Sequence, residues 1–452
     1  ASGGEQRYFL PIAVDWETRD HDPMERYGAF TIVRVRHKER VGIFYAALAN
    51  PDFARDVARA MGGNRETALG DGRLRFCSTA RFAQHAGAID EEVRTPALEQ
   101  TNTAVFFGNK LFLKGYRRMR LGVNPELEMG RFLTEVSPFP HIAPVLGALE
   151  YLSPTEAEPV TLAVLQRFVE NQGDLWTVVL EHLGRLLAMP SMPADAHAPA
   201  ETVAAAFHLN RMALLGRRVG EMHRALCHAS GEAAFDPEPI MAEDFAAWKA
   251  AVEKDLEATF ALLQGALGGM PESARPLATA LIEARATLGE RLRAIAPPAG
   301  PVMKTRYHGD LHLGQVLVAQ DDFIIVDFEG EPERSLEERR AKGSVLRDVA
   351  GMLRSFSYAA HAALVRREPG AAADAGAREL AEWQASARHF FLEGYCKASQ
   401  GVASVPADRA GFDATLELFL IEKALYELRY EIANRPDWLE IPVRGLMELT
   451  KQ

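Results

Sequence analysis

The sequence predicts an α+β fold in which a small sheet-bearing part is followed by a large, mainly helical part. Strand-like alternation and hairpin signals fill the chain up to about residue 170, and after Trp176 the composition becomes rich in Ala, Leu, Glu and Arg. One dense polar run, TRYHGDLHLGQVLVAQDDFIIVDFEGEP, interrupts the helical part, and within it VLV and FIIVDF have the pattern of strands around the turn AQDD. We therefore expect two or more lobes.

A chain of 452 residues is too long for one hydrophobic core, so two or three structural units are expected. Residues 1–90 are predicted to form a small β-rich N-terminal cap, with strand-like stretches and one short helix opened by Asn50 and Pro51. Residues 91–170 are predicted to form a mixed N-lobe, in which NTAVFF and KLFLKGY make a hairpin and NPELEMGRFLTEV makes a helix. Residues 171–452 then form the helical C-lobe.

The composition excludes several classes of protein. Apolar residues make up 48% of the chain and the net charge is −11, which argues against non-specific binding to nucleic acid. No apolar run reaches the roughly 18 residues that a membrane span needs. Three widely spaced cysteines are typical of free thiols in a reducing compartment, so we expect a cytoplasmic protein. The start ASGGEQRYFLPIAV, without Met, indicates a fragment or a processed product.

The most informative motif is HGDLHLGQ, residues 308–315, followed after one predicted hairpin by DFEGE, residues 327–331. Phosphoryl transfer needs a carboxylate that faces the acceptor hydroxyl and oxygen ligands that hold Mg²⁺ on the phosphates of ATP. Asp310 suits the first task, and Gln315 and Asp327 suit the second. Either string alone is more often an ordinary turn, but the two in this order favour a kinase catalytic loop. His312 is expected to be structural or to face the acceptor.

A second group of residues upstream suits the phosphates of ATP. Lys114 ends a predicted strand and Glu128 lies in the following helix, so the two are predicted to pair, with Glu126 as the rival partner. The usual glycine-rich loop is absent. Backbone N–H groups near Thr101 and Thr103, with the two hydroxyls, are expected to contact the phosphates instead.

With these motifs assembled, the chain resembles the maltokinases, which are related to aminoglycoside phosphotransferases and protein kinases. The resemblance is carried by EQTNT, NPELE, VLQRFVENQGDLW, HGDLHLGQ, DFEGEP, ERRAKGSVLRDVAGMLRSF and YELRYEIANRPDW. It implies a bilobal protein-kinase-like fold and the transfer of phosphate from ATP, with Mg²⁺, to the anomeric hydroxyl of maltose. The product, α-maltose 1-phosphate, would serve α-glucan (glycogen) synthesis.

The resemblance also implies roles for individual residues. Asp310 is the catalytic residue, Gln315, Asp327 and Glu329 bind metal, and Lys114 and Glu128 hold phosphate. The segment joining the lobes would contact adenine through its backbone, at Gln166, Phe168 and Val169. The cap lacks an initial segment that full-length relatives have, which suggests a chain cut from a fusion with trehalose synthase, the expected covalent or non-covalent partner.

The C-terminal stretch YELRYEIANRPDW is predicted to form the acceptor site. Tyr426 and Tyr430 lie at i, i+4 spacing on one helical face, and Trp438 follows, so their rings suit the apolar faces of glucose units. Glu431 and Arg435 are expected to bind hydroxyls. Packing of these aromatic rings in a hydrophobic core is the competing interpretation.

Two other functions remain open from sequence. The chain could be an aminoglycoside or other small-molecule phosphotransferase, or a nucleotide-binding pseudokinase that regulates a partner enzyme. The presence of Asp310, Gln315 and Asp327 argues against the pseudokinase. Asp348, in LRDVAG, is expected to cap a helix or brace the catalytic loop.

Overall fold

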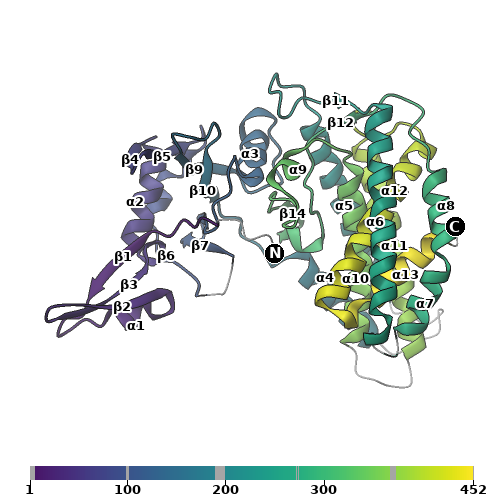
Figure 1. The fold of residues 1–452 in the computed structure, drawn as a ribbon, viewed down its shortest axis with the longest axis horizontal. Helices are drawn as coiled ribbons and strands as arrows, with labels where there is room; N and C mark the ends of the chain where they lie inside the picture. The colour runs from purple at the N-terminus through teal and green to yellow at the C-terminus, as the bar shows by residue number, and fades with distance from the viewer. Residues whose placement is uncertain are drawn as a thin grey trace. The chain divides into compact units, whose positions relative to one another are not determined.

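The computed structural model describes residues 6–97, 101–188, 199–270, 272, 274–366 and 373–450. The chain divides into two compact units, shown in Figure 1 from purple to yellow along the sequence. Unit 1 comprises Ala1–Glu170 and Asp327–Arg339, and unit 2 comprises Asn171–Val326 and Arg340–Gln452. Unit 1 is rich in antiparallel strands and unit 2 is mainly helical, so the predicted α+β class is confirmed.

Unit 1 contains two antiparallel sheets. One has three strands in the order β1-β3-β2, and the other has seven strands in the order β4-β5-β9-β10-β8-β7-β6. The strands are β1 (Ile12–Trp16), β2 (Thr31–His37), β3 (Arg40–Ala46), β4 (Glu66–Leu69), β5 (Gly72–Ser78), β6 (Val93–Arg94), β7 (Asn102–Phe107), β8 (Leu111–Tyr116), β9 (Val145–Leu152) and β10 (Val160–Arg167).

Two helices pack on opposite faces of the seven-stranded sheet. Helix α2 (Pro51–Gly62) begins at Asn50, whose side chain caps it, and its buried side chains share a core with alternate residues of β7, β8, β9 and β10. Helix α3 (Pro125–Arg131) begins at Asn124 in the same way and packs against the other face, where Tyr116, Leu127 and Val164 meet. Because side chains alternate along a strand, β8, β9 and β10 contribute residues to both cores. A short helix, α1 (Pro23–Tyr27), precedes β2, and α9 (Leu336–Arg340) lies where the chain returns to unit 2 after Arg339.

Unit 2 is built around long helices that pack against one another. Helices α5 and α11, α10 and α12, α12 and α6, and α10 and α11 are in contact, and Figure 1 shows them running alongside one another. The helices are α4 (Leu175–Ala188), α5 (Pro199–Leu226), α6 (Ala242–Ala266), α7 (Arg275–Glu283), α8 (Arg285–Ala294), α10 (Leu346–Val365), α11 (Ala373–Ala398), α12 (Arg409–Asn434) and α13 (Glu440–Leu449).

Two small antiparallel strand pairs lie among the described residues of unit 2, and the second of them is a hairpin. Strands β11 (Glu238–Pro239) and β12 (Met303–Lys304) pair, and so do β13 (Val316–Ala319) and β14 (Asp322–Ile325). The second pair is the hairpin predicted between the two kinase-like motifs. Among the described residues, no helix is long and apolar enough to cross a bilayer. All three cysteines are free thiols.

The strand pairing does not follow the division predicted at residue 90. Strand β5 lies in the predicted cap, yet it pairs with β9 of the predicted N-lobe over six residue pairs, from Arg73 with Leu152 to Ser78 with Gly147. Local alternation indicates that a segment is a strand but not which distant strand it pairs with. A separate role for residues 1–90 therefore stays a prediction, as does their function as a cap.

Candidate active site

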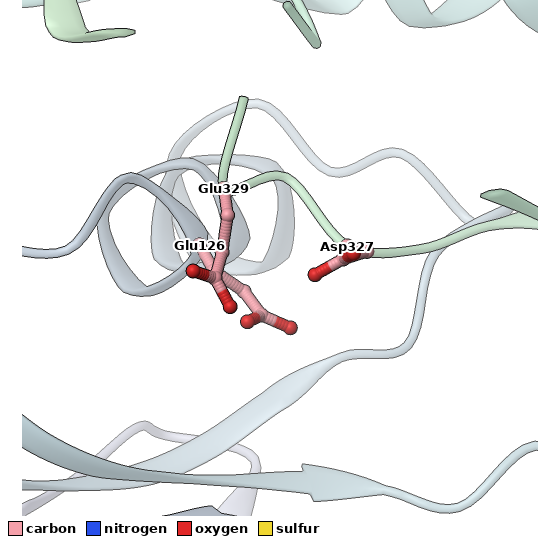
Figure 2. A group of neighbouring side chains, drawn as sticks. All are labelled: Glu126, Asp327 and Glu329. Carbon is pink, nitrogen blue, oxygen red and sulfur yellow. The ribbon is translucent and has the colours of Figure 1, made fainter. Parts of the chain in front are cut away.

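Three carboxylates surround one lysine in unit 1. The Nζ atom of Lys114 lies 2.7 Å from Glu126 Oε2, 2.8 Å from Asp327 Oδ1 and 2.6 Å from Glu329 Oε1. Lys114 comes from β8, Glu126 from α3, and the other two carboxylates from the DFEGE segment. Figure 2 shows the three carboxyl groups gathered beside the helix that carries Glu126. The structure thus brings together two motifs that lie about 200 residues apart in the sequence.

The alternation of β8 explains why Lys114 faces α3. Leu111 and Leu113 point into the core beneath α2, so Lys114 and Tyr116 point to the opposite face, where α3 lies. The hydroxyl of Tyr116 donates to Glu126 Oε2 at 2.6 Å, which fixes the carboxylate that receives Lys114.

The predicted pairing of Lys114 with Glu128 is wrong, and Glu126 is the partner. Residues two apart in an α-helix point in directions about 200° apart. Since Glu126 faces the sheet with only 3% of its surface exposed, Glu128 projects from the other side of α3. The packing of Leu127 against Val145 and Val164 in the core sets which side of α3 faces the sheet.

The cluster is electrostatically unbalanced. Burial disfavours the charge on Lys114, but the three carboxylates outweigh it, so the pKa of Lys114 is raised well above its usual value. Burial raises the pKa of Glu126, and the carboxylates of Asp327 and Glu329 act in the same direction against Lys114. Three carboxylates therefore meet the single ammonium of Lys114 within hydrogen-bonding distance. Such a site favours a lysine that stays protonated and the approach of a divalent cation.

Only part of the cluster suits a metal ion. Glu126, Asp327 and Glu329 offer oxygen atoms within 4.8 Å of one another. Glu126 is buried and already accepts hydrogen bonds from Lys114, Tyr116 and Gln166, whereas the side chains of Asp327 and Glu329 are 38% and 25% exposed. Hard carboxylate oxygens of this kind fit Mg²⁺. Of the three carboxylates in this cluster, Asp327 and Glu329 therefore fit the ion better than Glu126.

The backbone at Asp327 is held in an unusual conformation. Its φ angle is +65°, in the left-handed region that non-glycine residues seldom adopt. A residue held there carries local strain, which structures keep where a side chain must be directed. Here the turn directs the carboxylate of Asp327 to Lys114.

Thr103, one of the two threonines predicted to contact phosphate, does not share the face of Lys114. The side chain of Asn102, which pairs with Tyr116 across β7 and β8, lies on that face, and its Nδ2 donates to Glu329 at 3.4 Å. Alternation turns Thr103 the other way, and its hydroxyl accepts a hydrogen bond from Arg117 at 3.0 Å. Thr101 is exposed just before the strand, and residues 98–100 lie outside the described residues.

The predicted adenine segment lies at the end of β10, immediately before the chain leaves unit 1 after Glu170. Gln166 is buried, and its amide donates to Glu126 at 3.4 Å, so its side chain supports the lysine partner. The N–H of Phe168 donates to the carbonyl of Lys110 at 2.8 Å and is already used, and Val169 is buried. Contact between this segment and adenine stays a prediction.

Asp310 lies in unit 2 on a loop that Asp348 anchors. The buried carboxylate of Asp348, at the start of α10, accepts the N–H groups of His308 at 2.8 Å and Gly309 at 2.9 Å, and a hydrogen bond from His223 at 3.0 Å. Gly351 of α10 lets the loop approach closely, because a Cβ there would lie 2.7 Å from the carbonyl oxygen of Leu311. Of the two roles predicted for Asp348, bracing of this loop is confirmed, and the catalytic role of the loop stays a prediction.

The ring of His308 also helps to hold the loop that carries Asp310. Its Nε2 lies 2.9 Å from the carbonyl oxygen of Val326, so Nε2 must donate, and its Nδ1 accepts the N–H of Asp310 at 3.3 Å. Both ring nitrogens are therefore used within the loop. The side chain of Asp310 remains 23% exposed, which leaves its carboxylate accessible to a substrate.

The brace gives a prediction about stability. Burial would raise the pKa of Asp348, but the hydrogen bond and charge of His223 and the backbone donors outweigh it, so its pKa is lowered. Its stabilisation is then present above the unfolded-state pKa of about 4 and is lost as pH falls through the lower folded value. Asp348→Asn should lower stability at pH 7 by at least about 2 kcal/mol, because buried N–H groups lose a charged acceptor.

The measurement is the urea midpoint of wild type and variant between pH 7 and pH 3. The difference between them should be largest near neutral pH and should shrink at the acid end. Asp413→Asn is the matched control, since Asp413 forms only an exposed pair with Arg409 on α12. Equal midpoints for wild type and Asp348→Asn at pH 7 would show that the loop does not depend on this carboxylate.

His312 and Gln315 lie in the short 3₁₀ turn between the loop and β13. The Nδ1 of His312 accepts the N–H of Gly314 at 3.0 Å, so this ring has a structural task as the cap of the turn. The carbonyl of Gln315 accepts the N–H of Val326 at 3.0 Å, which ties it to the residue that precedes Asp327 in the chain. Metal binding by Gln315 and acceptor contact by His312 stay predictions.

Four of the predicted acceptor residues form a series of contacts that begins at Asp310. We call Tyr426, Tyr430, Arg435 and Trp438 the acceptor row. The Nζ of Lys423 lies 3.5 Å from Asp310 Oδ1 and 4.9 Å from the ring centre of Tyr426. The rings of Tyr426 and Tyr430 stack at 6.4 Å, and the guanidinium of Arg435 lies 5.2 Å from Tyr430 and 5.0 Å from Trp438. Tyr430 is 37% exposed. A fully buried packing role is therefore excluded for Tyr430.

Glu431 does not present its carboxylate to solvent. It is 1% exposed, and its oxygens accept hydrogen bonds from Tyr358 at 3.0 Å and from Arg435 at 2.7 and 3.0 Å. Because Glu431 is buried and its oxygens already accept these hydrogen bonds, this geometry does not offer its carboxylate to a sugar hydroxyl. Glu431 and Arg435 are four residues apart, so their side chains can pair along one face of the helix end. Glu431 instead orients Arg435.

Sequence reasoning missed Asn102, Tyr116 and Lys423. Period-two alternation around Lys114 would have found the first two, because they lie on its face of the sheet. The i, i+3 spacing of Lys423 and Tyr426 indicated that Lys423 lies beside the predicted acceptor residues on the same helical face. No local pattern connects Lys423 with Asp310.

Comparison with known proteins adds a fold to this geometry. A solved structure of glucosamine kinase matches this chain with a TM-score of 0.64 and 21% sequence identity, over 92% of each chain. A glucosamine kinase in complex with glucosamine, ADP and inorganic phosphate matches with a TM-score of 0.63 and 20% identity, over 99% of this chain and 95% of that chain. The chain has the fold of the glucosamine kinases. The predicted kinase-like arrangement of a sheet-bearing unit and a helical unit is thus confirmed.

Two curated relatives carry the same description. A glucosamine kinase of Streptacidiphilus jiangxiensis is 27% identical over 294 residues, which are 65% of this chain and 58% of the relative. One of Mycolicibacterium smegmatis is 25% identical over 358 residues, 79% of each chain. The chain therefore spans little more than half of the first relative. No family model matches the chain. The relatives are glucosamine kinases, whereas the motif resemblance pointed to maltokinases.

Proposed function

We propose that this chain is an ATP-dependent sugar kinase. The observation that carries the proposal is Lys114, held by the buried Glu126 and by Asp327 of the DFEGE segment. A strand lysine paired with a helix glutamate is the arrangement that kinases use to hold the phosphates of ATP. In the proposed reaction, Asp310 accepts the proton of the acceptor hydroxyl while that oxygen bonds to the γ-phosphorus and the bond to ADP breaks.

The residues present fit Mg²⁺ as the accompanying ion. Asp327 and Glu329 offer partly exposed carboxylate oxygens close to each other, and Gln315 is the predicted amide ligand. A bound Mg²⁺ supplies charge neutralisation on the phosphate oxygens. The carboxylates of Asp327 and Glu329 are held in place by hydrogen bonds from Lys114 and Asn102 and by the backbone turn at Asp327.

Glucosamine is the first candidate for the acceptor, because both curated relatives are described as glucosamine kinases and a structurally similar chain binds glucosamine with ADP and phosphate. Maltose is the second candidate. The row of Tyr426, Tyr430 and Trp438 offers more than one ring on which successive sugar units could stack. With maltose, the proposed product is α-maltose 1-phosphate, and trehalose synthase is the partner that the sequence resemblance implies.

The test is ADP release with ATP, with and without Mg²⁺, in the presence of glucosamine, maltose, glucose or an aminoglycoside. Sugar-dependent ADP release that requires Mg²⁺ is the expected result. A response to the aminoglycoside alone would assign the chain to antibiotic phosphotransferases. Nucleotide binding without turnover of any acceptor would favour a pseudokinase.

Removal of one ring tests the acceptor row. Tyr430→Ala should raise the acceptor KM by about tenfold, equivalent to a contact of roughly 1.4 kcal/mol, and should leave the ATP KM within about twofold. Steady-state kinetics with each substrate varied in turn provide the measurement. Tyr8→Ala, which removes a 60% exposed ring in unit 1, is the control. Equal changes in both KM values, together with a lower melting temperature, would favour a packing role for Tyr430.

A further inference from the structure

A lysine of α12 contacts the carboxylate to which we assign the acceptor proton. The Nζ of Lys423 lies 3.5 Å from Asp310 Oδ1, and the two side chains are 22% and 23% exposed. The sequence motifs do not include Lys423, and it lies 113 residues from Asp310. Both groups belong to unit 2.

The fold fixes both sides of this contact. Asp310 sits on the loop anchored by Asp348. On α12, the neighbouring Glu422 receives two hydrogen bonds from Arg347, at 2.9 and 3.3 Å, and the Arg347 guanidinium lies 4.3 Å from the ring centre of Phe419. The turn of α12 that carries Lys423 is therefore held against α10, the same helix that holds the Asp310 loop.

The ring of Tyr426 limits where the ammonium can go. Its ring centre lies 4.9 Å from Lys423 Nζ, a distance at which the face of an aromatic ring attracts a cation. A lysine side chain has four rotatable bonds, so a partner on each side of its ammonium reduces its freedom. Tyr426 and Asp310 together place the charge of Lys423 between the acceptor row and the reacting carboxylate.

The contact is unsuited to a purely structural role. Partly exposed ion pairs contribute little to stability, since solvent screens them. What a nearby ammonium does effectively is to orient a carboxylate and occupy one of its oxygens. With Oδ1 of Asp310 taken by Lys423, Oδ2 is left for the acceptor hydroxyl.

We propose that Lys423 is a positioning residue of the phosphoryl-transfer site, which orients Asp310 through Oδ1 so that Oδ2 receives the acceptor's proton. This rests on the proposed kinase function. Lys423 itself takes no part in bond making or breaking. Its loss should therefore act on turnover, through Asp310, and not on the binding of ATP.

The test is a double-mutant cycle between Lys423 and Asp310. Lys423→Met should lower kcat by about 10- to 100-fold, the range expected when a catalytic group is misplaced, and leave the ATP KM within about twofold. Lys423→Arg, which keeps the charge, should restore most of kcat. In an Asp310→Asn background, Lys423→Met should cost little more, because the group it positions is already lost.

Lys254→Met is the control, since Lys254 is an exposed lysine of α6 in the same unit. Melting temperatures of all variants should match that of wild type. An equal loss in both backgrounds, no rescue by arginine, or a raised ATP KM with unchanged kcat would each overturn the assignment. A wild type with no sugar-dependent ADP release is a separate outcome that removes the proposed function, and this role of Lys423 with it.

Discussion

Lys114→Met is expected to lower kcat/KM for ATP by about 100- to 1000-fold, the cost typical of removing one preorganised charge from a polar active site. The methionine keeps the length of the side chain but removes the ammonium that three carboxylates surround. Glu126, Asp327 and Glu329 then repel one another and the phosphates of ATP. The acceptor KM should change little, because this cluster belongs to unit 1.

Lys110→Met is the matched control for Lys114. Lys110 precedes the same strand, but its side chain is 63% exposed and pairs only with Glu91 at 3.1 Å. Steady-state kinetics should give wild-type values for this variant, and a nucleotide-binding assay should locate the defect of Lys114→Met in ATP binding and turnover. A Lys114→Met enzyme with near wild-type kcat/KM would exclude a phosphate-holding role for the cluster.

Asp310→Asn should lose at least about 100-fold in kcat, or roughly 3 kcal/mol of barrier, while ATP affinity changes little. Asparagine keeps the size of the side chain but cannot take the acceptor's proton. The loop itself should survive, because its anchors are the backbone N–H groups of His308 and Gly309 on Asp348, not the side chain of Asp310.

Asp321→Asn provides the comparison, since Asp321 is an exposed residue in the turn between β13 and β14. Initial rates at saturating ATP and acceptor measure kcat, and ATP titration of each variant measures affinity. Turnover by Asp310→Asn at close to the wild-type rate would refute the assigned role and, with it, the interpretation of HGDLH as a kinase catalytic loop.

The local signals in the sequence predicted individual elements well. Asn50 with Pro51 and Asn124 with Pro125 begin α2 and α3, because an Asn side chain caps the first free N–H groups and proline suits the first helical position. The hairpins β7–β8 and β13–β14 follow from runs of apolar residues around turn residues. These features depend only on neighbours in the chain.

Predictions of which side chains face Lys114 were less successful. Glu126 and not Glu128 meets Lys114, because the phase of α3 against the sheet depends on packing with Leu127 and Val164 in the core. Asn102 rather than Thr103 shares the lysine's face for a similar reason, since the register of β7 on β8 decides which side chains point there. A one-residue change of register between β7 and β8 would exchange Asn102 and Thr103.

The sequence by itself determined the α+β class, the motif residues Asp310 and Asp327, and the strand that carries Lys114, since each rests on local pattern and residue chemistry. Only the tertiary structure decided that Asp327 and Glu329 join unit 1 around Lys114, that Asp348 holds the Asp310 loop, and that Lys423 contacts Asp310. These contacts join residues 40 to more than 200 positions apart. Side chains that distant in sequence meet only through the packing of whole elements, which no local periodicity encodes.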